Sequence, residues 1–228
     1  MMKRLMTLAL TAAGLLASTP AAAQETLDLG TLKNEEITVV QKLLYPKTDR
    51  TEMFFMLGAN GVAFEPWMVA PKVEIGFGKH MSETLGWQLA VSGGYGIGTS
   101  AYREVSGVAY GIAPEAYRYL AEVTAGVTWS PIYGKMNWQG QRILHNDVYV
   151  PIVGGLTVEQ LAWGEKYLSF APTVGVGVGM RVFQGDNAAI RLEIRDDVIL
   201  QNRKQSGTMK VKQNVGIHVG FSRLGEKK

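Results

Sequence analysis

The feature that most constrains this chain is a ten-residue stretch, 173–182, in which apolar residues alternate strictly with small or polar ones. The even positions are Val174, Val176, Val178, Met180 and Val182, and the odd positions are Thr173, Gly175, Gly177, Gly179 and Arg181. Because successive side chains of a strand point to opposite faces, the stretch predicts a strand with one apolar face and one nearly bare, polar face. A soluble barrel would fill its inner face with bulky side chains. The pattern is therefore typical of a strand whose apolar face meets lipid and whose small face meets a narrow barrel interior.

Seven other segments of the chain also alternate, which predicts an all-β fold, an eight-stranded antiparallel transmembrane β-barrel. The expected strands are 51–57, 71–79, 85–98, 117–129, 147–157, 169–183, 188–200 and 210–222. An even number of strands places both ends of the barrel domain on the periplasmic side. The short turns at 80–84 and 184–187 are expected on that side, together with an unusually long connection, 130–146.

Aromatic residues provide a second indication of a membrane barrel. On the outward parity, Phe77, Trp87, Trp129 and Phe221 lie at the inferred periplasmic ends of their strands, whereas Tyr95 and Tyr119 lie toward the opposite ends. Two aromatic girdles are typical of barrels that cross a membrane. The architectural alternative is a soluble, lipocalin-like periplasmic barrel, which does not require them.

The N-terminus has the three parts of a secretory signal peptide. Lys3 and Arg4 make the start of the chain basic and precede an apolar stretch, 5–16. Small residues at 21–23 predict cleavage between Ala23 and Gln24. No later run is long and apolar enough for a membrane-spanning helix, which takes about 20 residues. The expected organisation is a signal peptide at 1–23, a short periplasmic N-terminal segment at 24–50, an outer-membrane β-barrel at 51–222 and a tail at 223–228. The expected location is the bacterial outer membrane.

Charged residues recur on the inward parity of the predicted strands, beginning with Glu52. The others are Lys72, Glu74, Arg118, Glu122, Arg181, Arg191, Glu193, Arg195 and Lys212. An eight-stranded barrel is just wide enough for side chains to fill it. Buried charges must pair or be hydrated, and both signs are present in similar number. We therefore expect a structural network of ion pairs that closes the interior, with a solute path as the alternative.

Little in the sequence indicates catalysis. The net charge is only +3, too balanced to suggest nucleic-acid binding, and the chain has no cysteine. Motifs of serine hydrolases, zinc proteases and phosphate-binding loops are absent from the sequence. His80, His145 and His218 lie apart from one another along the chain. We expect no catalytic, cofactor-binding or metal site, and hence no enzyme, although a lipid-modifying outer-membrane enzyme is kept as a less favoured alternative.

The last predicted strand resembles the C-terminal signal that the bacterial barrel-assembly machinery recognises. That pattern is a polar residue, a glycine, a hydrophobic residue and a final aromatic, here Asn214, Gly216, Val219 and Phe221. Ser222 to Lys228 follow the aromatic, whereas the aromatic usually ends the chain. The resemblance implies the barrel-assembly machinery as a partner.

The chain from about 34 to 222 is also similar to an outer-membrane β-barrel domain family of myxobacteria and related bacteria. The stretches that carry the similarity are 34–41, 129–136, 175–183 and 190–196. Some members of that family are barrels of gliding-motility complexes. The resemblance implies an anchoring or assembly component of an envelope-spanning complex, such as a gliding-motility machine, surrounded by outer-membrane lipid. It also implies periplasmic or outer-membrane protein partners. A small-solute channel is the main alternative function.

Overall fold

The computed structural model describes residues 44–64, 66–107, 110, 114–138, 142–164 and 166–226. The predicted signal peptide and most of the segment 24–50 lie outside the described residues. The long strands are β1 (Thr51–Ala63), β2 (Met68–His80), β3 (Leu85–Gly94), β5 (Tyr117–Trp138), β6 (Arg142–Leu161), β7 (Leu168–Phe183), β8 (Ala188–Asn202) and β9 (Met209–Leu224). The short elements are β4 (Ile97–Gly98) and a seven-residue helix, α2 (Ser100–Ser106).

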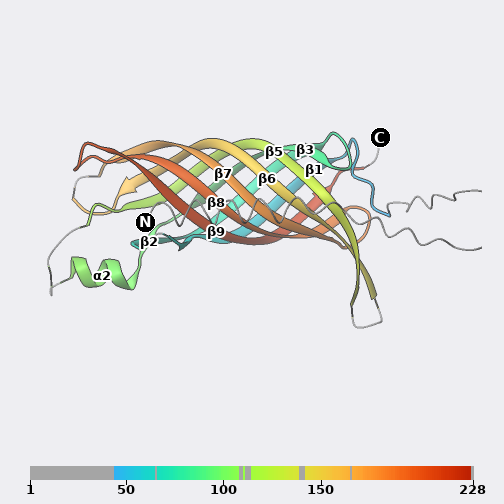
Figure 1. Cartoon of the computed structure of the whole chain (residues 1–228), viewed down its shortest axis with the longest axis horizontal. Coiled ribbons are helices and arrows are strands. Elements are labelled where there is room, and N and C mark those ends of the chain that lie inside the picture. The colour runs from blue at the N-terminus through green and yellow to red at the C-terminus, as the bar shows by residue number, and fades with distance from the viewer. Residues whose placement is uncertain are drawn as a thin grey trace, which may run out of the picture. The chain divides into compact units, whose positions relative to one another are not determined.

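The eight long strands form one closed antiparallel ring (Figure 1). Each pairs with the next long strand along the chain, and β9 returns to pair with β1, where Phe55 faces Phe221. Closure satisfies the backbone hydrogen bonds of every wall strand, as a protein that crosses lipid with strands requires. β4 pairs with the start of β2. The structure confirms the predicted eight-stranded antiparallel barrel.

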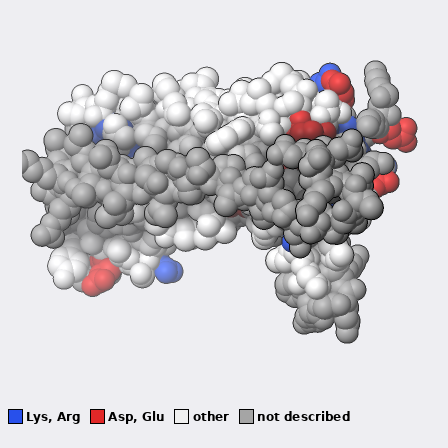
Figure 2. All heavy atoms as spheres, turned by 45° about the vertical axis from the view of Figure 1, so that its right-hand side comes forward, with Lys and Arg blue, Asp and Glu red and all other residues white. Residues whose placement is uncertain are grey.

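The wall of the barrel is apolar outside and polar inside. Along β7 the even residues are mostly exposed and the odd residues mostly buried, as the alternation predicts. Valines and isoleucines from other wall strands extend the exposed apolar surface, including Ile75, Val91, Ile152 and Ile194. Figure 2 shows charged side chains gathered toward the two ends, with other residues along the wall between them. In the described part of the chain, no helix has the length and hydropathy that a membrane crossing demands.

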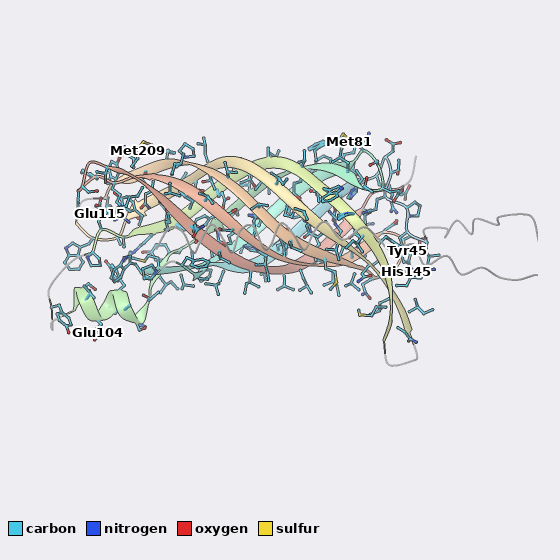
Figure 3. All side chains as sticks on the ribbon, in the orientation of Figure 1. Tyr45, Met81, Glu104, Glu115, His145 and Met209 are labelled. Carbon is cyan, nitrogen blue, oxygen red and sulfur yellow. The ribbon has the colours of Figure 1, made fainter. Side chains whose placement is uncertain are left out.

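The two ends of the barrel differ in their connections. The turns after β2 and β7 are short, 81–84 and 184–187, whereas α2 and the longer connections lie at the opposite end. Figure 3 places Tyr45, Met81 and His145 at the first end and Glu104, Glu115 and Met209 at the other. Because short turns face the periplasm in barrels of this class, we call the first end periplasmic and the second external.

Residues 130–146 are not an irregular connection. β5 continues to Trp138 and β6 begins at Arg142, so the two strands form a hairpin that extends beyond the barrel wall (Figure 1). Their pairing shifts register between Trp129 and Ile132 and then continues to the Trp138–Arg142 pair. Such a bulge bends a strand and increases its twist. The described residues of the long periplasmic segment, 130–138 and 142–146, therefore belong to the paired strands β5 and β6.

A second bulge corrects two predicted side-chain directions. The β5–β6 pairing shifts between Tyr119 and Ala121, which reverses the parity of β5 on the external side of the bulge. Tyr119, expected in the outer girdle, is buried, and its hydroxyl hydrogen-bonds Ser92 at 2.6 Å. Arg118, expected in the interior network, instead lies over the exposed ring of Tyr95 and donates to its hydroxyl.

Candidate functional site

The periplasmic half of the interior is organised around two buried carboxylates. Asp147 accepts from the Lys47 ammonium and, at 3.0 Å, from the Arg181 guanidinium. Glu52 accepts from Arg181 at 3.2 Å and lies 3.5 Å from Arg191. Because a buried charge without a partner is expensive, each of these groups depends on the others.

The central layer of the interior has Arg195 as its hub. Its guanidinium reaches Glu74 at 2.8 Å, Asp197 at 2.9 Å and Glu193 at 3.0 Å. Lys72 is the second cation of this layer, 3.3 Å from Glu74 and 3.2 Å from Glu122. Arg191 lies 3.4 Å from Glu193 and so joins the central layer to the periplasmic one. The ion pairs therefore form one connected network from the periplasmic mouth to the middle of the barrel.

Aromatic rings fill the space around the arginines. The Tyr149 ring lies 4.2 Å from the Arg181 guanidinium carbon and 4.9 Å from that of Arg191, and its hydroxyl donates to Glu193 at 2.8 Å. Phe54 lies on the Arg191 guanidinium at 4.1 Å. A Cβ on Gly179 would overlap the Tyr149 ring, and one on Gly76 would overlap Phe54. The bare face of β7 thus leaves room for a ring that stacks on two arginines.

A separate group of polar contacts lies toward the external mouth. Glu159 accepts from Lys212 at 3.0 Å and from the Gln201 amide at 2.5 Å. Lys212 therefore pairs with a carboxylate outside the central layer. His218 and Asn60 belong instead to the central layer: His218 is opposite Glu193 in the β8–β9 ladder and hydrogen-bonds Asn60 at 3.0 Å, and the Asn60 amide donates to Asp197 at 3.4 Å.

Residues 44–50, which we call the strap, lie across the periplasmic mouth. Tyr45 stacks on Phe183 with 5.4 Å between ring centroids, and the Asp49 N–H donates to the His80 carbonyl at 2.9 Å. Arg50 donates to the Asn187 side chain at 2.6 Å and to the Gly225 carbonyl at 2.7 Å. The strap thus bonds to turns and strand ends around the mouth, and it brings Lys47 to the interior network.

Glu83, in the turn after β2, binds the strap backbone. Its carboxylate accepts from the N–H of Lys47 at 3.0 Å, from the N–H of Thr48 at 3.1 Å and from the Thr48 hydroxyl at 2.7 Å. Burial alone would raise the pKa of Glu83, but these hydrogen bonds lower it below its ordinary value. For Lys47, burial lowers the pKa below its ordinary value, although the neighbouring Asp147 carboxylate opposes that shift.

Acidification is therefore expected to loosen the strap. Because the pKa of Glu83 is lowered in the folded state, its contribution is present above the ordinary value of 4.5 and is lost as the pH falls through the lowered pKa. We expect hydrogen-exchange protection of the Lys47 and Thr48 amides, corrected for intrinsic rates, to decline below pH 4.5. Glu83→Gln should remove this pH dependence, and Glu115→Gln at the external end should not. If the protection of the Lys47 and Thr48 amides stayed constant throughout the acid range, Glu83 would not be the group that holds the strap.

The structure brings most of the sequence-predicted interior residues together. Lys72, Glu74, Glu122, Arg181, Arg191, Glu193 and Arg195 belong to the connected network, whereas Lys212 pairs with Glu159 and Arg118 lies outside. Sequence reasoning missed Lys47, Asp147, Glu159 and Asp197. Of the predicted assembly signal, Asn214 is buried, Gly216 adjoins Asn60, and Val219 and Phe221 are exposed on the outer wall.

The three histidines do not converge. His80 lies 3.0 Å from Glu52, His145 hydrogen-bonds Tyr133 at 3.2 Å, and His218 bonds Asn60. Among the described residues, no group of three or more His, Asp or Glu side chains has a geometry that could hold a metal ion. The buried side chains of the interior therefore hold charges in fixed pairs.

Comparison with known proteins finds similarity at the level of solved structures. No family model and no curated protein matches the sequence. The Neisserial surface protein A structure is 10% identical over 76% of this chain and 95% of its own, with a TM-score of 0.46. Ail of Yersinia pestis is 8% identical over 78% and 99%, with a TM-score of 0.41. The N-terminal β-barrel domain of Pseudomonas aeruginosa OprF is 9% identical over 77% and 98%, with a TM-score of 0.41.

The wall and the interior together define the class of protein. A closed antiparallel ring leaves no unpaired strand edge to lipid, and its apolar outer face suits a hydrocarbon environment. Trp87, Trp129 and Phe221 are exposed near the periplasmic ends of their strands, and Tyr95 near the external end. The chain is an outer-membrane β-barrel, located in the bacterial outer membrane.

Proposed function

We propose that this barrel is a closed structural component that anchors or assembles an envelope-spanning complex, and that its β5–β6 hairpin is the attachment point for a periplasmic partner. The observation that carries the proposal is the hairpin itself. β5 leaves β3 after Trp129, and β6 pairs with β7 only from Asn146 onward, so the pairs from Lys135–His145 to Trp138–Arg142 lie beyond the barrel wall. Met136 and Ile143 present exposed apolar side chains there. A two-stranded hairpin is marginal by itself, and exposed apolar surface with unpaired edges favours binding of another chain.

The interior supports an anchoring role over transport. Arginines and carboxylates in the middle of the barrel are buried and held by several partners each. Moving such a network aside for a solute would leave charges unpaired at a cost of several kcal/mol. The resemblance of 34–41 and 129–136 to a family with gliding-motility members favours an envelope machine of that kind as the complex.

Shortening the hairpin tests the proposal. Replacing 136–144 with Asn-Gly joins Lys135 to His145, which already face each other in the ladder, by a favoured two-residue turn. We expect the variant to fold and show heat-modifiable migration in gels, but to lose the envelope proteins that crosslink to the wild-type barrel in outer membranes. Ile143→Asp should weaken the same crosslinks without shortening the hairpin.

The matched control shortens the connection at 203–208, at the external end, and should leave the crosslinked proteins unchanged. Deleting 34–44 provides a second arm, because that segment is the other expected attachment point. Recovery of the same crosslinked proteins from the hairpin variants and from the 34–44 deletion would refute periplasmic docking.

A small-solute channel is the second candidate, and one observation favours it. Four interior atoms are buried and have no hydrogen-bond partner among the described residues: Glu122 Oε1, Asp147 Oδ1, His218 Nδ1 and Ser222 Oγ. Buried polar atoms of this kind commonly bind water. Stable ion conductance of the purified barrel in planar bilayers would support a channel, and absence of conductance would support the closed barrel.

A further inference from the structure

One face of the β5–β6 hairpin continues the lipid-facing wall of the barrel. Even-numbered side chains of β6 point outward in the wall, where Ile152 and Leu156 are exposed. The β6–β7 ladder keeps one register from Gln160 to Asn146. Because side chains alternate along a strand, Leu144 lies on the same outward face. The hairpin therefore extends the outer surface of the wall past the periplasmic end of the barrel.

This outward face is mainly apolar along the hairpin. Its facing pairs are Val148–Ile132, Asn146–Gly134 and Leu144–Met136. Ile132 is 57% exposed and Met136 is 37% exposed. Apolar side chains gain free energy when they leave water, and the surface that adjoins these residues is the one that already meets lipid.

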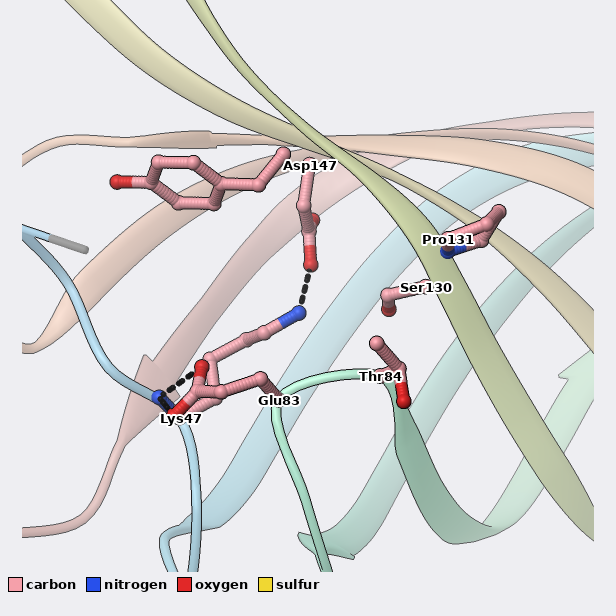
Figure 4. A pocket seen from close by; sticks show the side chains of 7 residues that line it. Lys47, Glu83, Thr84, Ser130, Pro131 and Asp147 are labelled. Atoms are coloured by element: carbon pink, nitrogen blue, oxygen red, sulfur yellow. Dashed lines mark hydrogen bonds and ion pairs between the residues drawn. The ribbon is translucent and has the colours of Figure 1, made fainter. Parts of the chain in front are cut away.

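The opposite face of the hairpin is more polar, and the strap packs on its root. Lys135 is exposed on that face, whereas Asp147 and His145 are buried. Figure 4 shows the Lys47 side chain reaching Asp147 from the strap. The Tyr45 ring lies edge-on to His145, with 5.2 Å between ring centroids. The strap thus takes the inner face of the hairpin root, and the exposed apolar residues lie on the outer one.

The bend at the root turns the hairpin along the membrane surface. Met136 comes seven residues after Trp129, which is about 23 Å of strand at 3.3 Å per residue. A straight continuation along the barrel would carry the apolar face into the periplasm. The bulge between Trp129 and Ile132 bends the strands instead, and in Figure 1 the hairpin runs across the length of the barrel. When a wall bends outward in this way, its outer face turns toward the membrane.

We propose that the outward face of the β5–β6 hairpin rests on the periplasmic phospholipid leaflet of the outer membrane. Ile132, Met136 and Leu144 lie among the lipid headgroups, and Lys135 on the opposite face stays in water. The inference goes beyond the proposed function, because this contact is with lipid and needs no protein partner. It leaves Ile143, which is exposed on the opposite face, for such a partner.

Site-directed spin labelling tests the contact, because the chain has no cysteine of its own. The full chain carries one labelled cysteine, Met136→Cys or Lys135→Cys, and is folded in vesicles of phosphatidylethanolamine and phosphatidylglycerol. Collisions of the label with oxygen, which concentrates in lipid, are compared with collisions with a water-soluble nickel complex. We expect the Met136→Cys label to approach the oxygen preference of Ile152→Cys on the wall. The Lys135→Cys label should approach the nickel preference of Glu104→Cys, which is exposed on α2.

A pair of substitutions tests whether the apolar face holds the hairpin on the lipid. Ile132→Asp combined with Met136→Asp should shift a label at Leu144→Cys from oxygen toward nickel, because a carboxylate is costly to remove from water. Ile143→Asp makes the same kind of replacement on the opposite face and should leave the Leu144→Cys label unchanged.

Three results would overturn the inference. The first is an equal nickel preference of the Met136→Cys and Lys135→Cys labels, and the second is an oxygen preference of both, since neither distinguishes the two faces. The third is a Met136→Cys label that nickel reaches in vesicles but not in native outer membranes, because a protein then covers this face. The vesicles contain no other protein, so the attachment proposal can fail in crosslinking while the lipid contact holds, and the reverse.

Discussion

Arg195→Met is expected to destabilise the barrel more than any other single substitution of an interior charge. The methionine removes the only guanidinium that reaches Glu74, Glu193 and Asp197 together among the described residues. The three carboxylates would then remain buried with one fewer cation between them. Breaking a buried pair in this way typically costs about 3–5 kcal/mol, and we expect a loss of that size in urea-induced unfolding, followed by tryptophan fluorescence in lipid vesicles.

An exposed lysine provides the matched control. Lys79 lies 3.7 Å from Asp49, and the two side chains are 43% and 72% exposed. Lys79→Met removes a cation from the same protein but from solvent, where such pairs contribute below about 1 kcal/mol. Equal losses for the two substitutions would show that the interior charges do not depend on one another, and would remove the basis for a closed barrel.

The strand pattern could be predicted from the sequence because the side-chain period of a strand is two and one face of every wall strand meets lipid. The alternation at 173–182 therefore marks β7 and the direction of its side chains, and the same argument identifies the other seven wall strands. Arg191, Glu193 and Arg195 share a parity on β8, so their convergence with Arg181 from β7 also follows once the ring is closed.

The interior residues that could not be predicted from the sequence were each concealed by their local surroundings. Asp197 continues the parity of Arg195, but it comes next to Asp196, which lies on the opposite parity, and the adjacent acids conceal the alternation. Asp147 precedes a run in which apolar residues occupy both faces, so its direction depends on the register of β6 rather than on a visible pattern. Lys47 belongs to a segment with no periodicity, and only the contacts of the strap place it in the barrel.

Bulges are the second reason why the sequence did not predict every side-chain direction. One inserted residue in β5 reverses parity between Tyr119 and Ala121 and exchanges the expected positions of Tyr119 and Arg118. The bulge at the root of the hairpin similarly hid the continuation of β5 beyond Trp129, because Pro131 and Gly134 resemble loop residues. A bulge depends on the partner strand, so a single strand's sequence does not reveal it.

Gly179→Ala is expected to destabilise the barrel although it adds a single methyl group. That methyl would overlap the Tyr149 ring, which is fully buried. The ring cannot withdraw freely, because Arg181 and Arg191 lie on it and its hydroxyl donates to Glu193. Overpacking of this kind costs about 1–3 kcal/mol, and loss of the hydroxyl bond would add to the cost. The measurement is again the free energy of unfolding in lipid vesicles.

Gly154→Ala separates this overlap from the general effect of replacing a strand glycine. Gly154 is exposed on the outer wall, and a Cβ there would approach only the Thr173 carbonyl oxygen, at 3.9 Å. We expect its effect to be neutral or slightly stabilising, since alanine suits a strand better than glycine. Combining Gly179→Ala with Tyr149→Leu should cost less than the sum of the single substitutions, because the smaller side chain removes the overlap. Strict additivity would mean that the bare face of β7 is not there to accommodate Tyr149.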